Sequence, residues 1–207
     1  MEIMAKLSVV CTLMSSLLLA GCVASRPPNV ANVCDIFDER RNWYKAAKRT
    51  EERWGIPVSV TMAFVYQESG FNARAKPDRT RFLWIFPGPR PSSAYGYAQA
   101  LDTTWNDYTS ATGNWDAKRS NFADAADFIG WYNAMSNRVS RIAPFDAANL
   151  YFAYHEGNTG YSRGTHQSKP WLINTAYNVQ ANVDRFQSQY TSCQEELDKN
   201  WFLRLLS

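Results

Sequence analysis

Residues 58–71 read VSVTMAFVYQESGF and decide the fold of this chain. An apolar run leads directly into an acid, Glu68, and Gly70 follows as the predicted left-handed cap of a helix. The negative end of a helix dipole and apolar neighbours both disfavour a charged carboxylate, so both raise the pKa of Glu68. A raised pKa is what a carboxylic acid needs to donate a proton near neutral pH. The stretch therefore predicts a helix that ends in an acid suited to acid chemistry.

The N-terminal segment is predicted to be removed before the protein folds. Leu7 to Ala20 is apolar, follows Lys6 and is too short to span a bilayer. Residues 19–22 read LAGC and resemble the cleavage box of bacterial lipoproteins, in which the cysteine becomes the lipidated first residue of the mature protein. We expect a signal peptide over residues 1–21, a lipid anchor on Cys22 and a tether over residues 22–34. The alternative is an ordinary secretory signal with an incidental cysteine.

The residue after Cys22 bears on location. This residue is Val23 and not Asp. The absence of Asp at this position resembles the pattern of lipoproteins that are sorted to the outer membrane. We therefore expect a bacterial outer-membrane lipoprotein that faces the periplasm and contacts the membrane through its lipid.

Length and charge bound the remaining chain. Removal of residues 1–21 from 207 leaves 186, enough for one domain, which we place at residues 35–193 with a C-terminal tail at 194–207. The net charge is +3, and the removed piece carries one acid and one base, so the mature charge is unchanged. This balance is too mild to predict a nucleic-acid partner, and it suits a polyanionic surface such as a cell wall.

The cysteines predict one disulfide. Cys11 leaves with the signal peptide and Cys22 is the candidate anchor, so Cys34 and Cys193 remain in the exported domain. Two cysteines in an oxidising compartment favour a bond, and two buried free thiols are the alternative. Closing so long a loop is worth about 4–5 kcal/mol as an upper figure in the chain-entropy model. The chain has no CxxC pair, which argues against a cysteine zinc site.

Hydrophobic spacing predicts a mainly helical domain. Apolar residues recur at helical spacing over 35–54, and Gly55 and Pro57 mark a stop and a new start. Further helices are predicted over 120–137, around 149–154 and over 176–190. Four prolines in residues 72–94 forbid a long helix there. The apolar segment 82–86 inside this loop predicts either a short strand or a flap over a cleft, with plain packing as an equal alternative.

Three motifs occur in order along the chain. They are ESGF at residues 68–71, GYAQ at 96–99 and AYHEG at 153–157. Together they resemble the motifs of the soluble-type lytic transglycosylases (SLT domain), which share the lysozyme-like fold. The resemblance covers about residues 35–190 and implies a mainly α, lysozyme-like fold in which the proline-rich loop is an insertion. Two positions depart from the family pattern: His155 stands where Asn is expected, and Trp171-Leu172 stands where a Tyr-Val pair is expected.

The family resemblance implies a reaction on peptidoglycan glycan strands. Glu68 would be the catalytic residue, first as general acid and then as general base, in cleavage of the MurNAc–GlcNAc β-1,4 bond with formation of 1,6-anhydro-MurNAc. It implies no cofactor. The residues expected to bind substrate or support the acid are Ser69, Tyr97, Gln99, Tyr154 and His155.

Several of these supporting residues have a structural alternative. Ser69 is expected either to support the acid by a hydrogen bond or simply to cap the helix end. Gln99 is expected either to donate to a sugar or to satisfy backbone in the groove wall. Tyr154 is expected either to orient Glu68 or the substrate through its hydroxyl or to be a core tyrosine. His155-Glu156 is not a zinc-protease pattern, because Thr159 stands where the second His belongs, so no metal is expected.

Two other functions compete with this prediction. One is a goose-type lysozyme that hydrolyses the same polymer. The other is an inactive lipoprotein that binds the cell wall or scaffolds a secretion system. A secretion or conjugation machine is a candidate partner for the enzyme as well.

Overall fold

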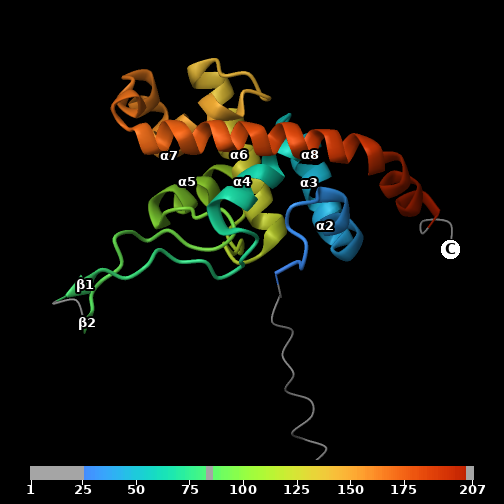
Figure 1. The fold of residues 1–207 in the computed structure, drawn as a ribbon, viewed down its shortest axis with the longest axis horizontal. Helices are drawn as coiled ribbons and strands as arrows, with labels where there is room; N and C mark the ends of the chain where they lie inside the picture. Colours follow the sequence, from blue (N-terminus) through green and yellow to red (C-terminus); the bar gives the residue numbers. More distant parts are fainter. Residues whose placement is uncertain (1–25, 83–85, 204–207) are drawn as a thin grey trace, which may run out of the picture.

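The computed structural model describes residues 26–82 and 86–203, which are mainly helical (Figure 1). The predicted signal peptide and Cys22 lie outside the described residues. The helices are α2 (Val33–Glu39), α3 (Arg41–Trp54), α4 (Val58–Ser69), α5 (Asp102–Thr112), α6 (Phe122–Ser140), α7 (Ala147–Ser162), the short 3-10 helix η2 (Thr165–Ser168) and α8 (Pro170–Leu203). None of these helices is long and apolar enough to cross a lipid bilayer.

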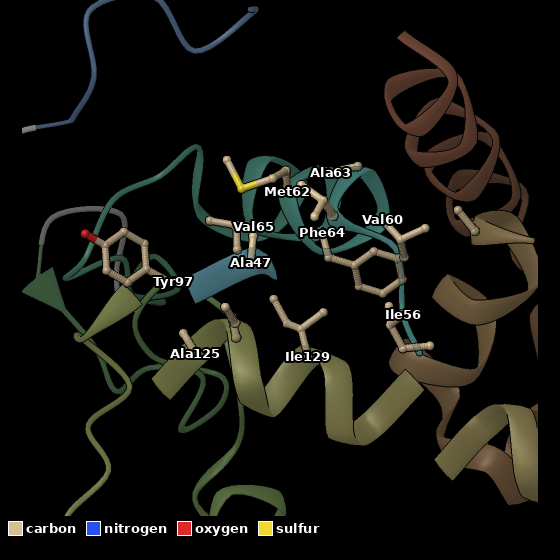
Figure 2. Close-up of a cluster of buried hydrophobic side chains, with 14 of the residues drawn as sticks. Ala47, Ile56, Val60, Met62, Ala63, Phe64, Val65, Tyr97, Ala125 and Ile129 are labelled. Carbon is tan, nitrogen blue, oxygen red and sulfur yellow. The ribbon is translucent and has the colours of Figure 1, made fainter. Parts of the chain in front are cut away.

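Helix α4 is the centre of the fold. Every residue from Val58 to Val65 is buried, and the helix contacts α3, α6 and α8. A helix that is apolar on all sides has no face for water, so it is stable only when others surround it. Figure 2 shows Ala125 and Ile129 of α6 pointing up toward α4, beside its residues Phe64 and Val65. Gly70 ends α4 as the predicted left-handed cap, with φ 54°.

The prediction of a single helix over 35–54 is wrong, because the helical backbone is interrupted at Arg40. Its backbone leaves helical geometry there, with φ −124° and ψ 64°. The break allows Phe37 of α2 and Tyr44 of α3 to pack against the same partner, Tyr190 of α8, with ring centroids 6.2 Å away in each case. The tertiary contact with α8 therefore accounts for a break that local spacing does not predict.

The two ends of the domain are joined by the predicted disulfide. Cys34 of α2 and Cys193 of α8 are bonded, with their Cα atoms 6.1 Å apart. Helix α2 begins at Val33, inside the predicted tether, and α8 continues to Leu203 through the predicted tail. Leu197 is buried in that part of α8, which explains why the helix does not stop at the disulfide.

The proline-rich loop projects from the helical body (Figure 1). It contains two short antiparallel strands, β1 (Arg81–Phe82) and β2 (Phe86–Pro87), with Phe82 opposite Phe86. The short-strand alternative is therefore confirmed for these residues.

An aromatic cluster fixes the chain on both sides of this loop. Trp43 of α3 stacks on Phe122 at the start of α6, with ring centroids 4.2 Å apart. It also contacts Phe71, directly after α4, and Tyr97, at centroid distances of 5.7 and 5.5 Å. The loop thus leaves and re-enters the body at anchored points, which positions the segment after it beside the end of α4.

Candidate active site

Glu68 lies in the last turn of α4 with only part of its side chain open to solvent. Burial among protein atoms raises the pKa of its carboxyl to about 7. A hydrogen bond from the Tyr151 hydroxyl acts in the opposite direction and favours the charged form, but burial is the larger effect. Near neutral pH the group is therefore present both as an acid and as a carboxylate, as the sequence predicts.

Helix α7 brings two tyrosines against the end of α4. Tyr151 and Tyr154 lie one turn apart, and Phe64 of α4 contacts their rings at centroid distances of 5.6 and 5.3 Å. Burial and the nearby Glu68 raise the pKa values of both hydroxyls, so both stay neutral hydrogen-bond donors at neutral pH. Sequence reasoning missed Tyr151. Its only signal is its position three residues before Tyr154, on the same helical face.

The hydroxyl of Tyr154 serves a different partner from that of Tyr151. It donates to the carbonyl oxygen of Ala98 at 2.6 Å. Tyr154 therefore connects α7 to the segment 96–99, whereas the hydroxyl that reaches Glu68 belongs to Tyr151. The Tyr154 hydroxyl thus has a backbone partner, as the core-tyrosine alternative predicts, and it helps to hold the segment 96–99 in place.

The segment 96–99 keeps its shape through backbone contacts that require a glycine. Gly96 has φ 77°, and a Cβ atom there would lie 2.1 Å from the carbonyl oxygen of Arg119. Gln99 Nε2 donates to the carbonyl oxygens of Ala75 and Gly96 at 3.0 and 2.9 Å. Of the two alternatives for Gln99, the structure shows the one in which its side chain satisfies backbone carbonyl groups.

Ser69 and Tyr97 also have structural partners. The Ser69 hydroxyl donates to the Val65 carbonyl oxygen, one turn back in α4, at 3.1 Å. Tyr97 is only 2% exposed and packs in the aromatic cluster. Such burial argues against direct contact of Tyr97 with a sugar, so this residue, expected to bind substrate or support the acid, is part of the core. The pattern around residues 96–99 alone does not show which of its side chains face inward.

A second carboxylate lies two residues beyond Tyr154. Glu156 accepts two hydrogen bonds from Lys169 Nζ, at 2.7 and 2.9 Å, and further bonds from Thr165 and the His155 ring. Lys169 and the hydroxyl of Thr165 are the main causes that lower the pKa of Glu156 to about 2. Glu156 is therefore a charged group that ties α7 to the segment after it.

His155 and Trp171 meet beside this ion pair. Their rings make an edge contact at a centroid distance of 5.0 Å, and Trp171 is 55% exposed. Gly157 interrupts the helix just beyond, with φ 74° and ψ 158°. His155 and Trp171, the two positions that depart from the family pattern, thus contact each other. Glu68 is not part of this contact. In the described ranges, no group of three or more His, Cys, Asp or Glu side chains has the arrangement of a metal site.

The three motifs therefore meet in space. Glu68 ends α4, Tyr154 lies against Phe64 of the same helix, and the Tyr154 hydroxyl holds Ala98 of the middle motif. A partly exposed acid with a pKa of about 7 and a tyrosine donor can release and take up a proton near neutral pH.

Comparison with protein families identifies the family of the chain. Residues 10–193 match the family model described as transglycosylase SLT domain. The chain belongs to the transglycosylase SLT domain family, and the mainly helical, lysozyme-like fold expected from its motifs is confirmed. No curated protein sequence matches the chain.

Proposed function

We propose that this protein is a peptidoglycan lytic transglycosylase that uses Glu68 as its single acid–base group. The observation that supports this most directly is the carboxyl of Glu68, which is buried enough to have a pKa of about 7 and is partly open to solvent. Membership of the SLT domain family indicates peptidoglycan as the substrate class.

The reaction follows from a group that can hold or release a proton at neutral pH. Protonated Glu68 donates its proton to the oxygen between MurNAc and GlcNAc, and the glycosidic bond breaks. The N-acetyl group of MurNAc stabilises the positive anomeric carbon. Glu68, now a carboxylate, takes the proton of the 6-hydroxyl of the same sugar, whose oxygen closes the 1,6-anhydro ring. The acid is regenerated and no water is consumed.

The Tyr151 hydroxyl suits both halves of this cycle. It hydrogen-bonds to Glu68 and therefore stabilises the carboxylate formed after the first proton transfer. Without it, burial alone would keep the proton on the acid more strongly and weaken the base step. We assign Tyr151 as a residue that adjusts the acid to both roles.

Ring closure is favoured over hydrolysis by the surroundings of Glu68. Hydrolases of glycosidic bonds commonly use a second carboxylate as base or nucleophile. Within residues 26–82 and 86–203, the influences on the pKa of Glu68 are burial and Tyr151, and no other carboxylate is among them. One acid with a tyrosine donor fits a reaction in which the sugar supplies its own nucleophile.

We propose further that the enzyme acts as an outer-membrane lipoprotein that faces the periplasm. Cys22 would carry the lipid, and the chain enters the domain close to the site, because the Arg26 guanidinium lies beside Gly70 at the end of α4. An enzyme held this close to its anchor would cut wall near the membrane, either for turnover or to open a gap for a secretion or conjugation machine. Mass spectrometry of protein from the envelope should find an acylated Cys22, and an unmodified Cys22 would contradict the anchor.

Product masses on purified sacculi test the reaction. We expect soluble muropeptides whose ends lack the water that hydrolysis adds. Glu68→Gln should abolish their release and leave wall binding intact, whereas Asp107→Asn, which removes an exposed carboxylate on α5, should behave as wild type. Hydrated ends would identify a hydrolase of the goose type. Normal release by Glu68→Gln would refute the assignment of the acid.

A further inference from the structure

The proline-rich loop carries the positive charge of the protein. Residues 72–91 contain five basic side chains and one acidic one, a net charge of +4, whereas the whole chain has +3. The rest of the chain is therefore slightly negative. The basic residues are Arg74, Lys76, Arg79, Arg81 and Arg90, and the acidic one is Asp78. A loop with this bias attracts an anionic partner, whatever the net charge of the chain.

The base of the loop forms a pocket beside this charge. A cavity of about 300 Å³, here called the loop pocket, is lined by Lys76, Arg90, Ser92, Tyr95 and Arg119, and by the carboxylate Asp102 at the start of α5. The Lys76 ammonium and the Arg119 guanidinium lie 5.2 and 5.4 Å from the centre of the Tyr95 ring. The aromatic ring thus holds two cations at the edge of one small cavity.

The cations of the loop pocket are not equivalent. Arg119 pairs with Asp102 at 2.6 Å and donates to the backbone at Ser93 and Ala100, so its charge is committed to holding the loop. In the part of the chain that the structure describes, neither Lys76 nor Arg90 pairs with a carboxylate. Arg90 donates one hydrogen bond to the Pro77 carbonyl oxygen, and both side chains are exposed. Lys76 and Arg90 are therefore available to an external anion.

The loop pocket is joined through the backbone to the segment 96–99. The carbonyl oxygen of Ala75, one residue before Lys76, accepts hydrogen bonds from the Gly96 amide and from Gln99 Nε2, each at 3.0 Å. The same segment is held at Ala98 by Tyr154, which lies beside Glu68. A ligand in the loop pocket and a sugar at Glu68 would therefore lie along one continuous piece of the protein.

We propose that the loop pocket binds a carboxylate of the peptide stem on the glycan strand that is being cleaved. The proposal rests on the proposed function, because MurNAc in peptidoglycan carries a short peptide with free carboxylates. Lys76 and Arg90 would each make a charge-assisted hydrogen bond to such a group. A concave pocket of this size suits a small charged group, whereas a flat membrane surface needs cations spread over an open face.

The test compares two substrates made from the same wall. One is glycan strands with their peptides, and the other is the same strands after an amidase has removed the peptides. The double variant Lys76→Gln/Arg90→Gln should lower the initial rate at low substrate concentration about 10-fold on peptide-bearing strands and leave the rate on stripped strands unchanged. The difference should shrink as salt is raised, because these side chains are exposed.

Two control variants test whether the effect depends on where the charges lie and on charge itself. Lys45→Gln/Arg138→Gln removes the same charge from exposed positions on α3 and α6 and should retain the stem preference. Lys76→Arg/Arg90→Lys keeps both cations and should also retain it.

Three outcomes would overturn the proposal. The double variant could lose rate equally on both substrates, or on neither. It could instead keep both rates and lose only binding to vesicles of anionic phospholipid, which would assign the loop to a membrane surface. The proposed function is read separately, from the anhydro ends that wild type releases from stripped strands. If those ends are hydrated instead, the proposed function fails while the stem preference remains measurable as a rate, so the two results are distinguishable.

Discussion

Two glutamates near the ends of their helical segments have opposite chemistry. Glu68, at the end of α4, has no cation among the causes of its shift, and burial raises its pKa to about 7. Glu156, just before the kink in α7, is 5% exposed at its side chain, and hydrogen bonds from Lys169 and Thr165 lower its pKa to about 2. Both occur in motifs of the family resemblance, so sequence position does not distinguish them. Their partners do distinguish them. Tyr151 leaves Glu68 able to gain and lose its proton near neutral pH, whereas Lys169 keeps Glu156 ionised.

Activity should separate the two acids most strongly. Glu68→Gln removes both the acid and the base and should lower the rate of anhydro-muropeptide release at least about 10³-fold. Glu156→Gln should lower it less than about 10-fold at neutral pH, because the group stays ionised and has a structural role. The measurement is single-turnover release from sacculi. Similar losses in the two variants would mean that the second acid also takes part in the chemistry.

Stability should change in the opposite sense to activity at Glu68. A carboxyl whose folded pKa is raised binds a proton more tightly in the native state, so its ionisation costs stability as pH rises from about 4.5 through about 7. Glu68→Gln should therefore raise the free energy of unfolding by about 2 kcal/mol at pH 8, after allowance for partial exposure, and change it little at pH 4. Denaturant unfolding at the two pH values measures this. A destabilised variant at pH 8 would mean that the carboxylate is favourably paired.

Stability should fall when the other acid is changed. Glu156→Gln loses the charge that Lys169 and His155 contact, and it should lower the free energy of unfolding by about 1 kcal/mol at pH 7, since these partners are more than a third exposed and screened. The folded pKa lies below the ordinary value, so the contribution is present above about pH 4.5 and is lost as pH falls through about 2. The pH slopes for the two glutamates should therefore have opposite signs. Lys169→Gln should reproduce the loss at pH 7, and a neutral result in both variants would show the network to be energetically silent.

The local features of the site follow from the sequence. An apolar run before Glu68 and a glycine two residues after it are enough to predict the helix, its cap and the direction of the pKa shift. Features set by distant contacts do not follow. The break at Arg40 depends on Tyr190, which lies on another helix. The choice of Tyr151 over Tyr154 as the donor to Glu68 depends on how α7 is placed against α4, because the two hydroxyls differ only in which partner each one meets.

The positive charge of the proline-rich loop is not apparent from the net charge of the whole chain. The net charge of +3 gives no sign that one loop carries +4, because the remaining residues nearly cancel it. A count over residues 72–91 alone would have found it. The aromatic side chains behave similarly, since the spacing around Tyr97 fits both a groove and a core, and only the contact with Trp43 decides between them.

The smallest expected effect concerns the hydrogen bond that distinguishes the two tyrosines. Tyr151→Phe removes the donor that favours the carboxylate, so the pKa of Glu68 should rise above about 7. The alkaline limb of the pH–rate profile, which reports protonated Glu68 in the free enzyme, should then move up by about half a pH unit, with a few-fold loss of rate. Tyr154→Phe is the matched control, because its hydroxyl donates to Ala98 and not to the acid. It should leave the limb in place and affect substrate affinity, through the segment that it positions. A shift in Tyr154→Phe and none in Tyr151→Phe would reverse the two assignments, and with them the explanation of why this acid can act twice.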